Sequence, residues 1–167
     1  FFHYLIPQKI FRLNPKVKWP VHFTSKVISP EKISKGVLCD PGDGLNNYIQ
    51  ANNGIHFGSN IELGPGVSII SSNHKKGNLR SHKNSKPIII GNNVWIGANC
   101  TVLPEISIGN NVIIGANSLV NKNIPDNSIA VGNPCLVIKK NEEYSEDLSK
   151  IIFNKKVPKK FFGTLNY

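Results

Sequence analysis

The chain has 167 residues, enough for one domain with a proper core, and no apolar run in it approaches the roughly 20 residues of a membrane-spanning helix. Its net charge is +10, but the sequence contains no basic helix and no known nucleic-acid-binding motif, so no nucleic acid is expected as a partner. The three cysteines indicate neither a disulfide framework nor a metal cluster, which favours a reducing, cytoplasmic location.

Residues 1–48 are expected to form an N-terminal arm and a lead-in loop. Prolines spread through the first part of this segment break any long helix, so we predict a short helix or arm followed by a lead-in strand. Residues 37–48 are rich in Gly, Pro and Asp and are predicted to be a loop. The arm is basic, which is typical of a solvated surface; it also favours an anionic polymer, or peripheral contact with a membrane, as a partner.

Residues 49–138 repeat in units of six, and the repeat is strictest between residues 88 and 123. Shifting the sequence by eighteen places aligns Ile88 with Ile106 and Gly97 with Gly115, so three units make one coil of a three-sided prism. Each unit has two apolar positions two residues apart, as in a short strand with one buried face. Stacked parallel strands then enclose one continuous core, with glycine at the corners. The predicted fold class is therefore all-β.

The register of the repeat breaks between Val67 and Ile88, which are 21 residues apart, a distance that is not a multiple of six. The excess lies in residues 71–87, which have no inward periodicity and are rich in Asn, Ser, Gly and Lys. We expect this segment to leave the prism as an extruded loop, and insertions of this kind often carry function.

Residues 139–167 are predicted to form a C-terminal helix and a tail. Asn141 is a suitable helix cap, acidic residues follow it, and lysines lie later, which matches the helix dipole. Such a helix is expected to cover the last coil.

The segment Ile90-Gly91-Asn92-Asn93-Val94-Trp95 resembles the repeat of the hexapeptide-repeat acyltransferases, in particular the sugar and polysaccharide O-acetyltransferases. The resemblance covers roughly residues 37–140. It implies a left-handed parallel β-helix, usually a homotrimer, that transfers acetyl from acetyl-CoA to a sugar hydroxyl, for example in a capsular or lipopolysaccharide glycan, without a metal. The handedness comes from the resemblance alone, because parallel crossovers are nearly always right-handed.

The resemblance also implies site residues. His74, at the start of the loop, matches the general base, which would take the proton of the attacking hydroxyl. Asn52 matches an acceptor-site position, and Asp43 and Asn73 are further acceptor candidates. The donor candidates, with Ala98 N–H holding the thioester oxygen, are Trp95, Gly97, Ala98, Gly115, Ala116, Asn121, Lys122, Pro134 and Lys139.

Each of these assignments has a simpler alternative. His74 is also acceptable as a surface histidine, Trp95 as packing between subunits, and the glycines and alanines as corner residues. Three other functions stay open: N-acetylation of an amino sugar, a metal-dependent hydratase built around histidines, and a non-catalytic β-helix scaffold.

Overall fold

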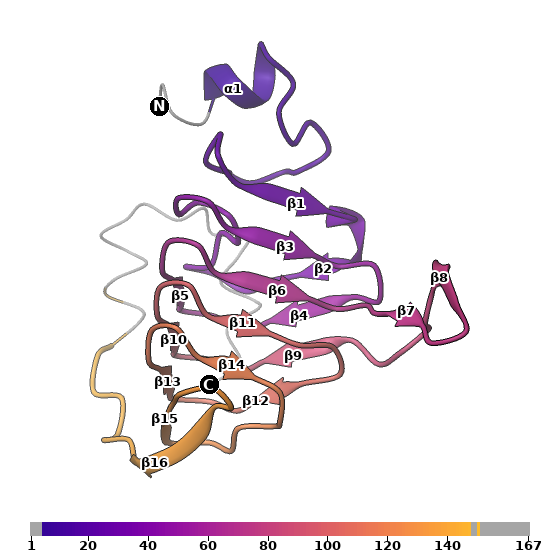
Figure 1. The fold of residues 1–167 in the computed structure, drawn as a ribbon. Coiled ribbons are helices and arrows are strands. Elements are labelled where there is room, and N and C mark those ends of the chain that lie inside the picture. Colours follow the sequence, from indigo (N-terminus) through magenta and orange to yellow (C-terminus); the bar gives the residue numbers. More distant parts are fainter. Residues whose placement is uncertain (1–4, 148–149, 151–167) are drawn as a thin grey trace.

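The computed structural model describes residues 5–147 and 150, and these residues form a mostly β structure wound into a three-sided coil (Figure 1). Helix α1 (Leu5–Lys9) lies at one end of the coil, and a short 3₁₀ turn, η1 (Pro30–Lys32), interrupts the first turn of the coil. No helix in this part of the chain is long and apolar enough to span a bilayer.

Three sheets form the three faces of the coil. The first, sheet A, contains in spatial order β1 (Lys26–Ile28), β3 (Tyr48–Gln50), β6 (Ser68–Ile70), β11 (Thr101–Val102) and β14 (Leu119–Val120). The second, sheet B, contains β2 (Ile33–Ser34), β4 (Ile55–Phe57), β9 (Ile88–Ile90) and β12 (Ser107–Ile108). The third, sheet C, contains β5 (Ile61–Leu63), β10 (Val94–Ile96), β13 (Val112–Ile114), β15 (Ser128–Val131) and β16 (Leu136–Lys140). Strand pairs in these sheets are parallel, except that β16 returns antiparallel to β15.

The six-residue spacing predicted from the sequence is confirmed by burial. The inward positions of both series between residues 88 and 120 are at most 5% exposed; they are Ile88, Ile90, Val94, Ile96, Cys100, Val102, Ile106, Ile108, Val112, Ile114, Ser118 and Val120. Each large aliphatic side chain buried in this way contributes roughly 1.5–3 kcal/mol of transfer free energy. One continuous apolar column therefore holds the three sheets together.

The coil begins earlier than the sequence predicted. β1 pairs in parallel with β3, with Lys26 opposite Tyr48, so ladder pairing starts inside the segment expected to be arm and loop. This first turn of the coil takes 48 − 26 = 22 residues rather than eighteen, because the loop at residues 40–47 adds length. The added residues hide the repeat, although Val21, Val27 and Cys39 are buried and lie at multiples of six from one another.

The glycines that directly follow the strands, such as Gly91 and Gly97, are needed for close stacking of the coils and not for a left-handed backbone conformation. A Cβ on Gly91 would lie 2.7 Å from the carbonyl carbon of Gly109 in the next coil, and a Cβ on Gly97 would lie 2.7 Å from Ala116 N. The left-handed backbone conformation falls two residues later, on asparagines such as Asn93, with φ of 55°. Asparagine tolerates this conformation better than most residues, so Gly and Asn share the corner between them.

The prediction that the C-terminal helix begins at Asn141 is wrong. Residues 141–147 have no regular structure, Lys150 is helical, and the rest of the expected helix lies outside the described residues. The sheet holds Asn141 instead: its backbone N–H donates to Asn127 O at 2.8 Å, and its side chain donates to Asn111 O at 3.2 Å. Backbone hydrogen bonding thus continues one residue beyond β16, through the position at which the helix was expected to start.

We expect Gly91→Ala to destabilise the fold by about 1–3 kcal/mol, because the new methyl group enters space that the backbone of the next coil already fills. Gly77→Ala is the matched control, since nothing lies within 4 Å of a Cβ at that position. Urea unfolding followed by circular dichroism measures both. Equal midpoints for the two variants would contradict the stacking role.

Candidate active site

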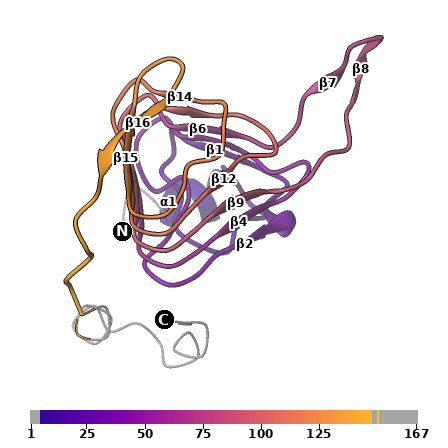
Figure 2. The same cartoon turned by 90° about the horizontal axis from the view of Figure 1, so that it is seen from below.

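An antiparallel hairpin leaves the coil between β6 and β9, at the corner between sheets A and B. It consists of β7 (His74–Lys75) and β8 (Asn78–His82), and Figure 2 shows it standing away from the prism. His74 lies opposite His82 in this pair, with ring centroids 4.8 Å apart and ring planes tilted by 30°. Both imidazoles are exposed in the single chain. His74 therefore lies at the base of a hairpin that projects from the coil.

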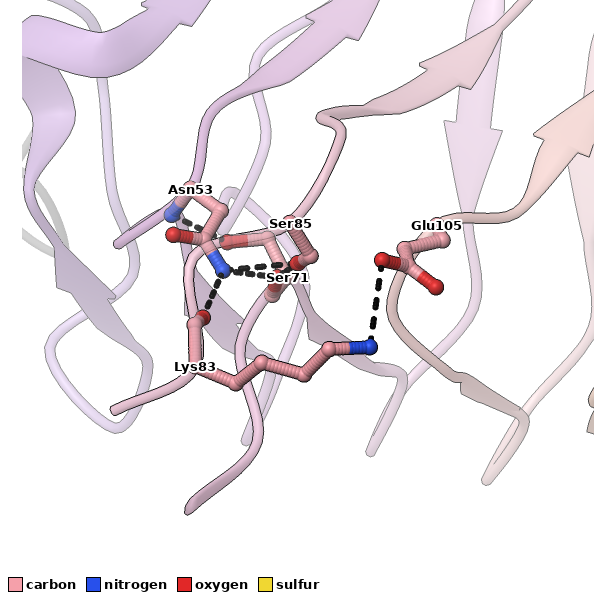
Figure 3. A network of polar contacts seen from close by, with 5 residues as sticks. All are labelled: Asn53, Ser71, Lys83, Ser85 and Glu105. Atoms are coloured by element: carbon pink, nitrogen blue, oxygen red, sulfur yellow. Dashed lines mark hydrogen bonds and ion pairs between the residues drawn. The ribbon is translucent and has the colours of Figure 1, made fainter. Parts of the chain in front are cut away.

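Asn53 ties the two ends of the hairpin to the coil (Figure 3). Its side-chain Nδ2 donates to Ser71 O at 3.0 Å on the outgoing side, and to Lys83 O at 2.9 Å and Ser85 Oγ at 2.8 Å on the returning side. Its backbone N–H donates to Ser71 Oγ at 2.9 Å. Lys83 adds an ion pair with Glu105, 3.6 Å long. Asn53 thereby fixes the direction in which the hairpin leaves, a role that the sequence analysis missed.

The two asparagines predicted to contact the acceptor both lie at this root. Asn52 Oδ1 accepts a hydrogen bond from Ser29 Oγ at 3.0 Å, and Asn52 Nδ2 donates to Ser72 Oγ at 3.4 Å. Asn73 is exposed, and its carbonyl accepts the Lys83 N–H at 2.7 Å, which closes the hairpin. The structure therefore brings Asn52, Asn73 and His74 to the same corner of the prism.

The second group of predicted residues lies at a different corner, between sheets C and A. Gly97-Ala98 follows β10, and Gly115-Ala116 follows β13 one coil further on. No atom of the described chain accepts a hydrogen bond from the N–H of Ala98 or of Ala116. Ala98 is half-buried and Ala116 is exposed, so both amides are left for solvent or for a ligand.

The corner between sheets B and C shows how unusual these amides are. There the N–H of Ser59 donates to Asn92 Oδ1 and that of Asn92 to Asn110 Oδ1, both at 2.8 Å. Asn110 N–H donates in turn to Asp126 Oδ1 at 2.6 Å. Side chains of the next coil thus cap the corner amides on one edge of the prism, whereas alanines leave them uncapped on the other.

Trp95 lies on the outer surface of sheet C, in the strand that leads to the Ala98 corner. Its side chain is 53% exposed, with Glu62 and Ile113 beside it in the neighbouring strands. The remaining predicted donor residues are exposed on the last coils: Asn121 and Lys122 after β14, Pro134 between β15 and β16, and Lys139 on β16.

Asp43 lies apart from the other acceptor candidates. The adjacent Gly44 approaches Leu63 at the end of β5, which places this loop beside sheet C, on the side of Trp95. The residue is exposed, yet its pKa is raised to about 6, first by desolvation and then by the carboxylates of Asp40 and Glu62. In a single chain, Asp43 therefore accompanies the donor candidates rather than Asn52.

A comparison with protein families matches residues 87–122 to the model described as bacterial transferase hexapeptide (six repeats). A solved maltose O-acetyltransferase from Clostridium difficile 630 is 37% identical, with a TM-score of 0.63, and the match covers 71% of this chain and 64% of that chain. A galactoside acetyltransferase solved in complex with coenzyme A is 31% identical, with a TM-score of 0.58, over 74% of this chain and 68% of that chain. The chain belongs to the hexapeptide-repeat transferase family.

Membership of the hexapeptide-repeat transferases confirms the resemblance stated from the sequence and accounts for the coil. The galactoside O-acetyltransferase of Lactococcus lactis subsp. lactis (strain IL1403) is 43% identical over 89 residues, 52% of this chain and 43% of that protein. The chain thus spans less than half of the length of such curated relatives. The matched repeats include Trp95 and the Ala98 and Ala116 corner, whereas the hairpin and Asn52 precede them.

The described residues of this hexapeptide-repeat protein contain no group of three or more His, Cys, Asp or Glu side chains placed to hold a metal ion. Burial raises the pKa of the Cys39, Cys100 and Cys135 thiols, and all three cysteines are free. Because the thiolate is the nucleophilic form of cysteine, these side chains are poor candidates for a covalent acyl intermediate.

We expect Asp43→Asn to alter the pH dependence of stability. The pKa of Asp43 in the folded protein, about 6, lies above the ordinary value of 3.8, so folding favours the protonated form. The wild type should therefore lose stability as pH rises from about 4 through 6, and the variant should lose less and melt higher above pH 6. Melting temperatures between pH 4 and 8 test this, with Glu143→Gln, an exposed acid, as the control. Parallel curves for wild type and Asp43→Asn would contradict the shift.

Proposed function

We propose that this protein is an acetyl-CoA-dependent O-acetyltransferase that acts on a sugar hydroxyl, in a glycan such as a capsular polysaccharide or lipopolysaccharide. The observation that carries the proposal is the uncapped amide pair of Ala98 and Ala116 on one edge of a prism whose next edge bears an imidazole on a projecting hairpin. Relatives named as maltose and galactoside O-acetyltransferases support the choice of reaction, and a galactoside acetyltransferase solved with coenzyme A supports the choice of donor.

The separation of these two edges implies an assembly. Within one chain sheet A lies between the His74 corner and the Ala98 corner, and the hairpin points away from the prism (Figure 2). A homotrimer of left-handed β-helices would let the hairpin of one subunit meet the Ala98 corner of its neighbour. The exposed side chains of Trp95, at 53%, and Ile89, at 48%, support such contacts, because subunits in closed symmetry would cover them.

In this arrangement His74 acts as the general base. Its imidazole takes the proton of the acceptor hydroxyl while the oxygen attacks the thioester carbonyl, and the thiolate of coenzyme A leaves after the tetrahedral intermediate collapses. The Ala98 N–H stabilises the oxyanion, as a fixed donor does in a desolvated site. The raised pKa of the three cysteine thiols supports direct transfer of the acetyl group.

The remaining residues hold the two substrates. The Ala116 amide binds the pantetheine arm, with Gly97, Gly115 and Trp95 beside it. Asn121 and Lys122 face the phosphates, and Pro134 and Lys139 lie at the adenine end. For the acceptor, Asn52 and Asn73 bind beside His74, and Asp43 of a neighbouring subunit contacts the hydroxyl-bearing sugar. The coil from Lys26 to Lys140, with the loop at 71–87, would form the catalytic domain in the cytoplasm.

We expect His74→Ala to lower kcat by about 100-fold or more, because the base is removed while the coil is untouched. His82→Phe is the control, since it keeps a ring against His74 and should change kcat by less than about threefold. Acetyl-CoA turnover with candidate glycans gives the rates, and size-exclusion chromatography checks the assembly. Near-normal turnover in a well-assembled His74→Ala variant would remove His74 from the mechanism.

The product should be an oxygen ester. Mass spectrometry of glycans incubated with acetyl-CoA is expected to show an added acetyl group that mild alkali removes, since esters hydrolyse under conditions that leave amides intact. An alkali-stable product would indicate N-acetylation of an amino sugar instead. If acetyl-CoA neither raises the melting temperature nor is consumed with any glycan, the protein is a non-catalytic scaffold.

A further inference from the structure

A groove of about 450 Å³ lies at the foot of the hairpin, and part of it plays no role in the mechanism above. Its walls come from three segments: Lys32 at the end of η1, the Asn52–Gly54 corner with His56 on β4 after it, and the return segment that contains Asn84, Ser85 and Pro87. Asn53, which fixes the hairpin, and Asn52, proposed to bind the acceptor, both line it. Whatever occupies the groove therefore lies beside the acceptor.

The lining of this groove favours a negatively charged ligand. Lys32 and His56 line it together with amide and hydroxyl side chains, and no carboxylate does. Lys32 Nζ donates to Asn52 O at 2.7 Å, and no described acid forms an ion pair with it. By contrast, Lys35 is paired with Asp40 at 2.9 Å and Lys83 with Glu105 at 3.6 Å. The groove thus contains a lysine whose charge no carboxylate in the described chain balances.

His56 provides a second directed group. Its Nδ1 is 2.6 Å from Ser34 Oγ, on the neighbouring strand of sheet B, where the two residues lie opposite each other in the ladder. This hydrogen bond orients the ring through one nitrogen. Within the described residues Nε2 has no hydrogen-bond partner, so it remains for a ligand in the groove. The hydrogen bond to Ser34 thus holds one ring nitrogen of His56 in place and leaves the other nitrogen directed at the groove, an arrangement common in functional histidines.

We propose that this groove binds an acidic group, a carboxylate or a phosphate, carried by the acceptor glycan, so that the natural acceptor is an anionic sugar. Lys32 provides the charge, and the Asn84 amide donates a hydrogen bond to the acid oxygens. His56 Nε2–H donates another in the tautomer whose Nδ1 accepts from the Ser34 hydroxyl. The proposal rests on the function given above, because Asn52 links the groove to the acceptor site. It adds an acidic group on the acceptor, whereas the relatives' names give only maltose and galactoside.

Isothermal titration calorimetry without acetyl-CoA tests the inference independently of catalysis. The carboxylate probes are tri-galacturonate and tri-mannuronate, each beside its neutral methyl ester; the phosphate probe is maltotriose 6-phosphate beside maltotriose. At least one acidic probe is expected to bind about tenfold or more tightly than its neutral partner, and to lose that advantage in high salt. Equal binding of acidic and neutral forms in every pair would overturn the inference.

Two variants locate the effect. Lys32→Ala should abolish the preference for the acidic probe over its neutral partner, and His56→Ala should reduce that preference severalfold. Lys26→Ala removes the same charge from an exposed lysine in sheet A and should keep the preference. If Lys32→Ala and Lys26→Ala behave alike, the groove is not the site.

Calorimetry and turnover assays can overturn the two proposals independently of each other. Binding of an acidic probe that depends on Lys32, without acetyl transfer to any glycan, would overturn the proposed function and leave an anion-binding groove. Transfer to neutral and acidic sugars with equal KM would overturn this inference and leave the acetyltransferase.

Discussion

The contact on which the rest of this structure depends is the close stacking of one coil's backbone on the next. At the corners the chains approach so closely that a methyl group on Gly91 or Gly97 would meet backbone atoms of the following coil at 2.7 Å. That spacing lets the parallel ladders of three sheets continue without interruption and packs the inward aliphatic side chains into one column. Because every coil is stabilised by its neighbours, individual corner residues can serve function while the core stays packed.

The three corners of the prism use the same geometry for different purposes. Where sheets B and C meet, asparagine and aspartate side chains satisfy the corner amides of the coil before, as Asn92 does for Ser59. Where sheets C and A meet, alanines cannot do so, and the amides of Ala98 and Ala116 point to no acceptor in the described chain. Where sheets A and B meet, the coil opens into the hairpin that carries His74. A repeating scaffold thus provides a stabilising edge, an edge with free donors and an edge with an imidazole.

The hairpin needs its own support because it leaves the core. Asn53 contributes to that support by donating from one amide group to residues on both sides of the exit. The neighbouring groove, with Lys32 and His56, uses the same corner. Positioning of His74 and recognition of an acidic sugar would therefore be coupled through Asn52 and Asn53. That His74 and the free amides lie on different edges of one chain explains why a second subunit belongs in the proposal.

The sequence alone predicted the coil, because a strict six-residue period leaves few ways to bury two apolar positions per unit, and it located the inserted loop by the break in that period. It also named Ala98, Ala116 and Asn52, through resemblance to a family. It misplaced the start of the coil, since a 22-residue turn between Lys26 and Tyr48 hides the repeat. It also began the C-terminal helix too early, at Asn141, whose backbone N–H and side-chain amide donate to Asn127 and Asn111 instead. Three features could not be predicted: the hydrogen bonds of Asn53 to both ends of the hairpin, the uncapped amides of Ala98 and Ala116, and the absence of an ion pair at Lys32 within the described chain. Each depends on which atoms lie opposite one another across coils, and only the tertiary structure determines those pairings.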